Sequence, residues 1–178
     1  IIQLRMKHVS REEILREARE VRRITQGSDT LFIVNDDPTI AAEVGADGVH
    51  VGQSDLPADV VRKLVPKDFL IGVSVGSVEE AEKAVRDGAD YVAVSPMFST
   101  SSKSDAGVGH GLDTARAICD AVSVPVVGIG GLNKENIPEV IKAGIDGIAV
   151  ISAVVSQEDI SASAAELSAI IAGAKRSV

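Results

Sequence analysis

A phrase of glycine, aspartate and a short apolar run occurs three times and constrains the fold of this chain more than any other feature. The copies are GADGVHV at 45–51, GADYVAV at 88–94 and GIDGIAV at 144–150. The glycine suits the left-handed position just after a helix end, and the apolar run suits a buried parallel strand. The glycines are 43 and 56 residues apart, which is too uneven for a solenoid but natural for β/α units with variable loops.

The rest of the chain continues this alternation of strand and helix. Apolar runs predict strands near 1–5, 31–34, 47–51, 70–74, 90–94, 125–128 and 146–150. Helices are expected near 11–25, 38–44, 58–65, 78–87, 112–122, 134–143 and 160–174. Helix starts are marked by a capping box, Ser77 to Glu80, and by Pro38 and Pro57 at first-turn positions. Seven strands alternating with seven helices predict either a (β/α) barrel or an open doubly wound sheet.

Two features favour the barrel, a (β/α)8 TIM barrel, over the open sheet. No GxGxxG motif follows a strand, and the glycine-rich segment GIGGLN at 128–133 comes late, where barrels often bind phosphate. The chain, 1–178, then forms one domain with strands 2 to 8 of the barrel. Because a barrel that lacks a strand has two unpaired edges, we expect a missing N-terminal βα unit or a partner chain at the gap. The sequence leaves open whether the chain forms a homo-oligomer.

Composition excludes several classes of protein. The chain has 26 acidic and 18 basic residues, a net charge of −8, no Trp and one Tyr, so a nucleic-acid partner is not expected. No uncharged apolar stretch approaches the length of a membrane span, and no signal-peptide pattern opens the chain. We therefore expect a cytoplasmic protein without a membrane partner. Cys119 is the only cysteine, which excludes an internal disulfide, and we expect it to be a buried helical thiol.

Acidic residues follow two of the predicted strands, in IVNDD at 33–37 and in HVGQSDLP at 50–57. Asp37 precedes Pro38, so its expected role is to cap the next helix. Asp36 stays available at the strand end, where barrel active sites are built. Asp55 could also belong to helix capping, but its pairing with Asp36 favours a Mg²⁺ site, because Mg²⁺ uses one or two carboxylates together with water and substrate phosphate.

Polar residues at the other predicted strand ends suit anion binding. Gln3, Arg5 and Lys7 alternate along the first strand and should project from one face, where an anion at the barrel mouth explains them better than a surface strand does. The long connection at 95–111 offers a phosphate cradle or, alternatively, a solvated loop. The other phosphate candidates are GIGGLN and VISA at 150–153, whose exposed amides suit phosphate.

The three histidines do not suggest nucleophilic catalysis. His50 alternates within GVHVG and is expected to be a packed strand residue, whereas His8 and His110 fall in loops. Neither of these two has a neighbouring Ser or Cys of the kind found in a catalytic triad.

Seven motifs, taken in order, resemble the thiamine-phosphate synthase family over essentially the whole chain. They are QLRMK, IVNDD, GADGVHVGQSDLP, IGVS, GADYVAVSPMFSTSSKSDAG, PVVGIGGLN and GIDGIAVISA. The resemblance implies a (β/α)8 barrel and a transferase that joins a hydroxymethylpyrimidine diphosphate to a thiazole phosphate. It further implies thiamine phosphate and diphosphate as the products, Mg²⁺ as the cofactor and a dissociative mechanism.

The resemblance also assigns the site residues. It implies that the pyrimidine diphosphate is held by Gln3, Arg5, Lys7, Asn35, Ser74 and Lys103, of which Arg5, Ser74 and Lys103 take part in catalysis. It implies that Mg²⁺ is bound by Asp36 and Asp55. It implies that the thiazole phosphate is held by Thr100, Ser101, Ser102, Gly131, Ile151 and Ser152.

The chain departs from the family pattern at Met6, where an acid is usual, and at Val75-Gly76-Ser77, where His and Thr usually follow the serine. Two alternative functions share the fold. A thiazole tautomerase-like relative tends to lose the acidic pair and the diphosphate-binding strand, whereas Asp36, Asp55, Arg5 and Lys7 are all present here. A non-catalytic barrel that binds phosphates of the thiamine pathway would bind ligand without turnover, and the intact acidic pair argues against it.

Overall fold

A computed structural model describes residues 1–100 and 109–176 of the chain. It consists of two compact units. The first unit comprises Ile1–Ser74 and Ala84–Tyr91, and the second comprises Val75–Lys83 and Val92–Val178. Helix α4 (Val78–Arg86) contributes residues to both.

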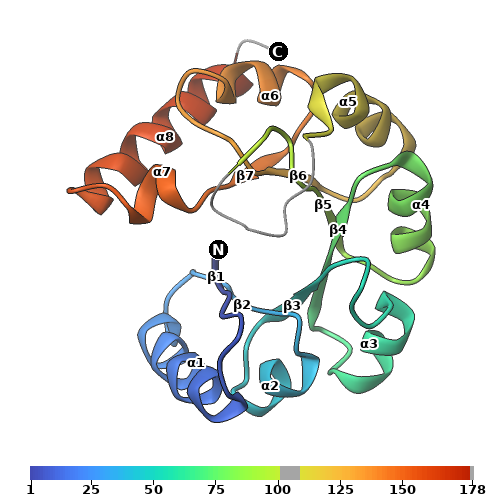
Figure 1. Cartoon of the computed structure of the whole chain (residues 1–178), viewed down its shortest axis with the longest axis vertical. Coiled ribbons are helices and arrows are strands. Elements are labelled where there is room, and N and C mark those ends of the chain that lie inside the picture. The colour runs from blue at the N-terminus through green and yellow to red at the C-terminus, as the bar shows by residue number, and fades with distance from the viewer. Residues whose placement is uncertain (101–108, 177–178) are drawn as a thin grey trace. The chain divides into compact units, whose positions relative to one another are not determined.

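The first unit alternates strands and helices as the sequence predicts. Its strands are β1 (Ile2–Leu4), β2 (Phe32–Asn35), β3 (Gly48–Val51) and β4 (Leu70–Val75), and its helices are α1 (Arg11–Thr25), α2 (Pro38–Glu43) and α3 (Ala58–Leu64). Neighbouring strands pair in parallel and in chain order, so that Ile33 is level with Gly48 and Gly48 with Leu70. The three helices lie on one side of these strands (Figure 1). Every residue of β3 is buried, as expected for a parallel strand that is covered on both faces.

The second unit repeats this pattern. Its strands are β5 (Tyr91–Val94), whose first residue Tyr91 still belongs to the first unit, β6 (Val126–Ile129) and β7 (Gly147–Ala149). Its helices are α5 (Gly111–Ala121), α6 (Ile137–Lys142), α7 (Ser152–Val155) and α8 (Ile160–Lys175). The strands pair in parallel, with Val94 level with Gly128 and Gly128 with Ile148. Helix α6 packs against α8 (Figure 1). The α/β class and the parallel strands are therefore confirmed.

The aspartate of the repeated phrase fastens each strand to its neighbour. Its Oδ2 atom accepts the N–H of a residue near the start of the preceding strand at 2.8 Å, and its own N–H donates to the carbonyl of that residue. The three pairs are Asp47 with Phe32, Asp90 with Ile71, and Asp146 with Val126. The glycine before each aspartate has a positive φ, between 65° and 100°, as the repeat predicts. The phrase thus ends one helix and anchors the next strand.

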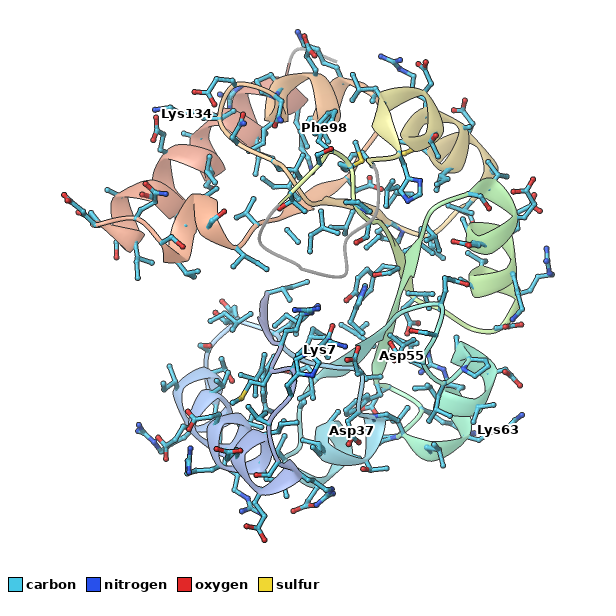
Figure 2. The ribbon with its side chains drawn as sticks, in the orientation of Figure 1. Lys7, Asp37, Asp55, Lys63, Phe98 and Lys134 are labelled. Carbon is cyan, nitrogen blue, oxygen red and sulfur yellow. The ribbon has the colours of Figure 1, made fainter. Side chains whose placement is uncertain are left out.

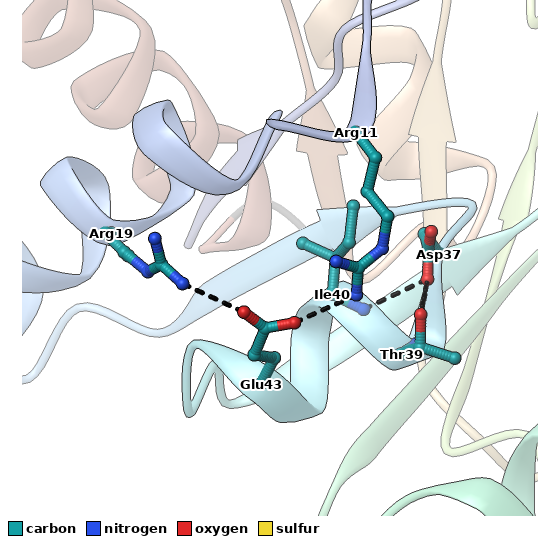
Figure 3. A network of polar contacts seen from close by, with 6 residues as sticks. All are labelled: Arg11, Arg19, Asp37, Thr39, Ile40 and Glu43. Atoms are coloured by element: carbon teal, nitrogen blue, oxygen red, sulfur yellow. Dashed lines mark hydrogen bonds and ion pairs between the residues drawn. The ribbon is translucent and has the colours of Figure 1, made fainter. Parts of the chain in front are cut away.

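Local capping explains where α2 begins. Asp37 caps α2 by accepting the N–H groups of Thr39 and Ile40 at 2.9 and 3.0 Å, and Pro38 is the first helical residue, as predicted. The Glu43 carboxylate at the end of α2 accepts hydrogen bonds from the guanidinium groups of Arg11 and Arg19 in α1, at 2.9 Å each (Figure 3). These bonds hold the two helices together.

Three boundaries and one short helix are the main differences from the sequence prediction. Strand β1 ends at Leu4, so Arg5 and Lys7 follow the strand and are not part of it. Pro57 is the N-cap of α3 and not its first residue. Helix α6 begins at Ile137, because Asn133 and Asn136 form a side-chain-bonded turn before it. Helix α7 was not predicted, since four residues of VISAVV are too short to show a helical period.

The predicted capping box of α4 forms only in part. The Ser77 hydroxyl accepts the Glu80 N–H at 3.3 Å, but the Glu80 carboxylate accepts the N–H of Gly76, one residue earlier than the box requires. In the described residues, none of the helices combines the length and the apolar composition needed to cross a membrane.

Candidate functional site

An acidic side chain, Asp36, and a basic one, Lys7, meet at the carboxyl ends of the first-unit strands. Asp36 follows β2 directly and has a φ of 69°, a left-handed value that few residues other than glycine adopt. Its N–H donates to the His50 carbonyl at 2.8 Å, and its carboxylate accepts a hydrogen bond from the Lys7 ammonium. Lys7 therefore reaches the end of the neighbouring strand, although it lies outside β1 (Figure 2).

Asp55 is a second acid at the same end of the first unit. Its Oδ2 atom accepts the Gly52 N–H at 2.7 Å, so it closes the turn after β3. The N-cap of α3 is Pro57, and no side chain caps this helix, so the alternative role of Asp55 in helix capping is not supported. Burial raises the pKa of Asp55, the Gly52 N–H lowers it, and the negative charge of Asp36 raises it further. The two carboxylates are therefore close enough to interact.

This donor set suits a hard divalent cation. Two carboxylates that repel one another are stabilised by a cation between them, and the Lys7 ammonium already bonds to one of them. Among the described residues there is no group of three or more His, Cys, Asp or Glu side chains that could hold a metal. A two-carboxylate site fits Mg²⁺, which keeps several waters and shares its shell with phosphate oxygens. It does not fit a structural zinc site, which uses four protein ligands.

The remaining predicted residues of the first unit lie along the same strand ends. Gln3 is exposed on β1, Arg5 is partly exposed after it, and Asn35 is the last residue of β2. Asn35 is level with His50 across the pair of strands β2 and β3. Because paired residues of parallel strands project from the same face, the Asn35 and His50 side chains share one face of the sheet.

Ser74 lies on β4 and is held by two residues from β3 and the turn after it. The His50 Nε2 atom is 2.9 Å from the Ser74 hydroxyl, and the Gln53 side-chain amide donates to the Ser74 carbonyl at 2.7 Å. His50 was expected to be a packed strand residue, and it is buried with 7% of its surface exposed. Sequence reasoning missed its contact with Ser74. The available signal was an ionisable residue within the apolar run GVHV.

The second unit holds a separate pocket. It is lined by residues from the segment after β5, the end of β6 and the start of α7: Ser95, Pro96, Thr100, Ile129, Gly130, Gly131, Leu132, Ala149, Val150, Ile151, Ser152 and Ala153. The structure thus brings together Thr100, Gly131, Ile151 and Ser152, four residues that the family resemblance assigns to the thiazole phosphate. The other three predicted residues of this connection, Ser101, Ser102 and Lys103, lie outside the described residues.

Gly130 and Gly131 are glycines for a packing reason. Both have a positive φ, 98° and 65°, and a Cβ atom at either would be 2.8 Å from Pro96 or Phe98. The Met97 and Phe98 N–H groups donate to the Ile129 and Gly130 carbonyls, so the two segments run in direct contact. These glycines therefore shape the wall of the pocket.

The departure from the family pattern at Gly76 also has a structural reason. A Cβ atom at Gly76 would lie 2.4 Å from the Cε1 atom of His110, closer than any real contact. The His110 ring occupies the space beside Gly76, so a larger residue at this position would require the ring to move. His110 itself directly precedes α5, and its N–H donates to the Pro96 carbonyl at 2.9 Å.

Comparison with known proteins agrees with the motifs. A family model described as thiamine monophosphate synthase matches residues 1–154. A thiamine-phosphate synthase from Methanoregula boonei is 56% identical over 98% of this chain and 81% of its own length, and one from Methanocella arvoryzae is 53% identical over 96% and 81%.

Solved structures agree as well. The thiamine phosphate pyrophosphorylase from Pyrococcus furiosus has a TM-score of 0.89 and 42% identity, and the match covers 97% of this chain and 83% of that one. A 3-hexulose-6-phosphate synthase, with a TM-score of 0.71 and 23% identity, shares the fold alone. The family match extends over most of the chain and the relatives are closely similar in sequence, so this chain belongs to the thiamine monophosphate synthase family of transferases.

Proposed function

We propose that this chain is a Mg²⁺-dependent thiamine-phosphate synthase. In this reaction a hydroxymethylpyrimidine diphosphate and a thiazole phosphate give thiamine phosphate and diphosphate. The observation that carries the proposal is the pair of interacting carboxylates, Asp36 and Asp55, beside the Lys7 ammonium. A relative that only binds phosphates, or that only isomerises a thiazole, has no need for two acids next to a diphosphate-binding lysine.

In this proposal, residues of the first unit hold the pyrimidine diphosphate. Asp36 and Asp55 are the Mg²⁺ ligands, and a bound Mg²⁺ supplies positive charge for the diphosphate oxygens. Arg5, Lys7 and Lys103 donate to the same oxygens, while Gln3, Asn35 and Ser74 orient the pyrimidine. Charge that develops on the departing diphosphate is stabilised by donors that are already in place, which is usually the largest contribution in such sites.

Residues of the second unit hold the thiazole phosphate. Thr100, Gly131, Ile151 and Ser152 line one pocket, which supports this assignment, and we place Ser101 and Ser102 in the same role from the family resemblance. Hydroxyl groups and unobstructed backbone N–H groups are suitable donors to a phosphate monoester.

The reaction proceeds by dissociation in this proposal. The bond between the pyrimidine methylene carbon and the diphosphate oxygen breaks first, and its electron pair leaves with the diphosphate. The thiazole nitrogen then donates its lone pair to the methylene cation, which forms the new C–N bond. No proton is transferred in either step, so no side chain has to act as a general base. Arg5 and Lys103 lower the barrier by stabilising the leaving group.

We also propose that the seven strands are strands 2 to 8 of a (β/α)8 barrel that forms a single domain over 1–178. The parallel pairing in chain order and the likeness to the Pyrococcus furiosus protein support this proposal. A further βα unit before Ile1 stays a prediction, as does a homo-oligomer. A cytoplasmic location is proposed because both substrates are anionic small molecules.

The test is diphosphate release with both substrates supplied, first with Mg²⁺ and then with EDTA. We expect release only when the pyrimidine diphosphate, the thiazole phosphate and Mg²⁺ are all present. Release that needs neither the second substrate nor the metal would contradict the proposal. A folded protein that binds the thiazole phosphate without any release would favour the tautomerase-like or the non-catalytic alternative.

A further inference from the structure

We propose that His50 is a positioning residue that turns the Ser74 hydroxyl into a hydrogen-bond donor toward the pyrimidine diphosphate. This inference rests on the proposed function and deepens it. It concerns His50, Ser74 and Tyr91, all of which belong to the first unit. The family resemblance assigns a role to Ser74 but none to His50 or Tyr91.

The three polar groups form a chain across the interior of the first unit. The His50 ring is held between two hydroxyl groups, with its Nε2 atom 2.9 Å from Ser74 Oγ and its Nδ1 atom 3.0 Å from the Tyr91 hydroxyl. The His50 and Tyr91 rings are 5.5 Å apart and tilted by 37°. A ring that is 93% shielded and bonded at both nitrogens has little freedom to rotate, so it holds Ser74 in one orientation.

Strand register and one glycine make this arrangement fit. His50 is level with Gly72 on β4, and Ser74 lies two residues further along the same face. A Cβ atom at Gly72 would be 2.0 Å from Tyr91 Cζ and 2.5 Å from His50 Nδ1. No other residue leaves room for the contact between His50 and Tyr91. The absence of a side chain at Gly72, within the apolar run LIGVSV, thus leaves the space that the His50 and Tyr91 rings occupy.

The chemistry of the three groups sets the direction of the hydrogen bonds. Phenol is a good donor and a weak acceptor, because its oxygen lone pair is delocalised into the ring, whereas an imidazole nitrogen accepts well. Burial also raises the pKa of Tyr91 to about 12, so the phenol keeps its proton. Tyr91 therefore donates to Nδ1. A neutral imidazole then carries its proton on Nε2 and donates it to the Ser74 oxygen.

The Ser74 proton is consequently directed away from His50. A hydroxyl that accepts from one side donates its own proton to the other, so Ser74 presents a donor to an acceptor atom of the pyrimidine diphosphate. The bond from Gln53 to the Ser74 carbonyl holds the backbone at the same residue. Side chain and backbone are thus both fixed before the substrate binds, which lowers the cost of ordering them during binding.

The first test compares two amide substitutions at His50. In His50→Asn the amide reaches only the position of Nδ1, so Ser74 loses its partner. In His50→Gln the longer side chain reaches the position of Nε2 and restores a donor to Ser74. We expect kcat/KM for the pyrimidine diphosphate to fall about tenfold in H50N and about threefold in H50Q, the range expected for one hydrogen bond. The KM for the thiazole phosphate should not change in either variant.

Two further variants complete this test. Ser74→Ala and the double variant H50N/S74A should lose the same activity, because His50 acts through Ser74. The control is His8→Asn, which makes the same change at an exposed histidine whose φ of 61° asparagine tolerates. Losses that add in the double variant, or an H50N enzyme as active as the wild type, would overturn the proposal.

The second test determines the tautomer of His50 directly and does not depend on enzyme activity. Nitrogen-15 NMR of the histidine rings should show His50 protonated on Nε2, and Tyr91→Phe should weaken this preference. A proton on Nδ1 in the wild-type protein would overturn the inference. If the wild-type protein has no synthase activity but His50 has the expected tautomer, the proposed function fails while the hydrogen-bond direction stands.

Discussion

Asp36 shows how a single residue can combine backbone conformation with charge. Its φ of 69° costs energy for a residue with a Cβ atom, although aspartate tolerates this region better than most residues. Unusual backbone conformations of this kind often occur at functional sites. Here the turn of the chain lets the carboxylate meet both Lys7 and the charge of Asp55.

The acidic pair leads to a prediction for Mg²⁺ dependence. Asp36→Asn and Asp55→Asn each remove one negative charge from the proposed metal site and keep the shape of the side chain. We expect diphosphate release to fall about 10²–10³-fold, as when one group that stabilises transition-state charge is lost. Steady-state assays over a range of Mg²⁺ concentrations measure the effect. Asp59→Asn on the exposed face of α3 is the matched control. Equal activity of all three variants would contradict the metal assignment.

Lys103 was assigned from the sequence and lies outside the described residues. If it stabilises the departing diphosphate, Lys103→Ala should lower turnover about 10²–10³-fold and leave the fold intact. Lys63→Ala, which removes an exposed lysine from α3, is the control. Turnover and circular dichroism measure the two effects separately, and an unchanged turnover would refute the role of Lys103.

Cys119 leads to a pH prediction for stability. Cys119 lies in α5 and is only partly buried, not fully buried as the sequence predicted. This burial, together with the negative charges of Asp146 and Asp120, raises the pKa of its thiol from the usual 9.0 to about 11. The folded chain therefore holds this proton more tightly than the unfolded chain does. The stabilisation is complete below pH 9 and is lost as the pH rises toward 11.

The measurement is the free energy of unfolding in urea between pH 8 and about 10, for the wild type and Cys119→Ala. We expect the wild type to lose more stability over this range than the variant. Native Cys119 should also react slowly with thiol reagents at neutral pH and faster in urea, because the thiolate is the reactive form. Equal slopes with pH in the two proteins would show that the thiol titrates normally.

At the scale of elements, the repeated phrase stabilises the fold by joining each strand to the one before it. The carboxylates of Asp47 and Asp90 each also bond to an arginine, Arg22 and Arg62 respectively. Arg62 further donates to the Phe69 and Gly88 carbonyls at 2.6 and 2.9 Å. The Arg62 side chain thus bonds to the residue before β4, to the turn after α4 and to Asp90. Asp90 is therefore the best place to test the repeat.

We predict that Asp90→Ala destabilises the protein by about 1–3 kcal/mol, because the Ile71 N–H loses its acceptor and Arg62 loses its partner. Urea unfolding measures this loss. Asp113→Ala is the control, since the Asp113 side chain is fully exposed in its pair with Arg116 and should change stability by less than about 0.5 kcal/mol. A loss at Asp113 as large as that at Asp90 would refute the role assigned to the repeat.

At the scale of the whole molecule, ligand binding should raise the stability of the folded chain. A ligand that binds only the folded chain raises the free energy of unfolding by mass action. Mg²⁺ and inorganic diphosphate together should therefore raise the melting temperature, by about 2–4 °C for each kcal/mol of binding in a chain of this size. Either compound alone should do less, because the acidic pair repels free diphosphate. Thermal unfolding with each compound and with both tests this expectation, and EDTA should abolish the combined effect.

The alternation of strands and helices was predictable because its causes are local. Apolar runs, Asp37 before Pro38 and a glycine after each helix end act over a few residues, so the order of the elements could be read from the chain. The bounds of β1, α6 and α7 were predicted less well, or missed. There, a short element or a side-chain turn such as that of Asn133 outweighed the pattern.

The sequence by itself determined the α/β class, the family and the residue types at the strand ends, because these depend on composition and on short motifs. Only the tertiary structure decided which of them meet. Lys7 reaches Asp36 across 29 residues, His50 reaches Ser74 across 24 and Tyr91 across 41, and the repeated aspartates reach back 15 to 20 residues. Such contacts depend on strand register and side-chain direction, which are properties of the packed chain and are not encoded in any single segment.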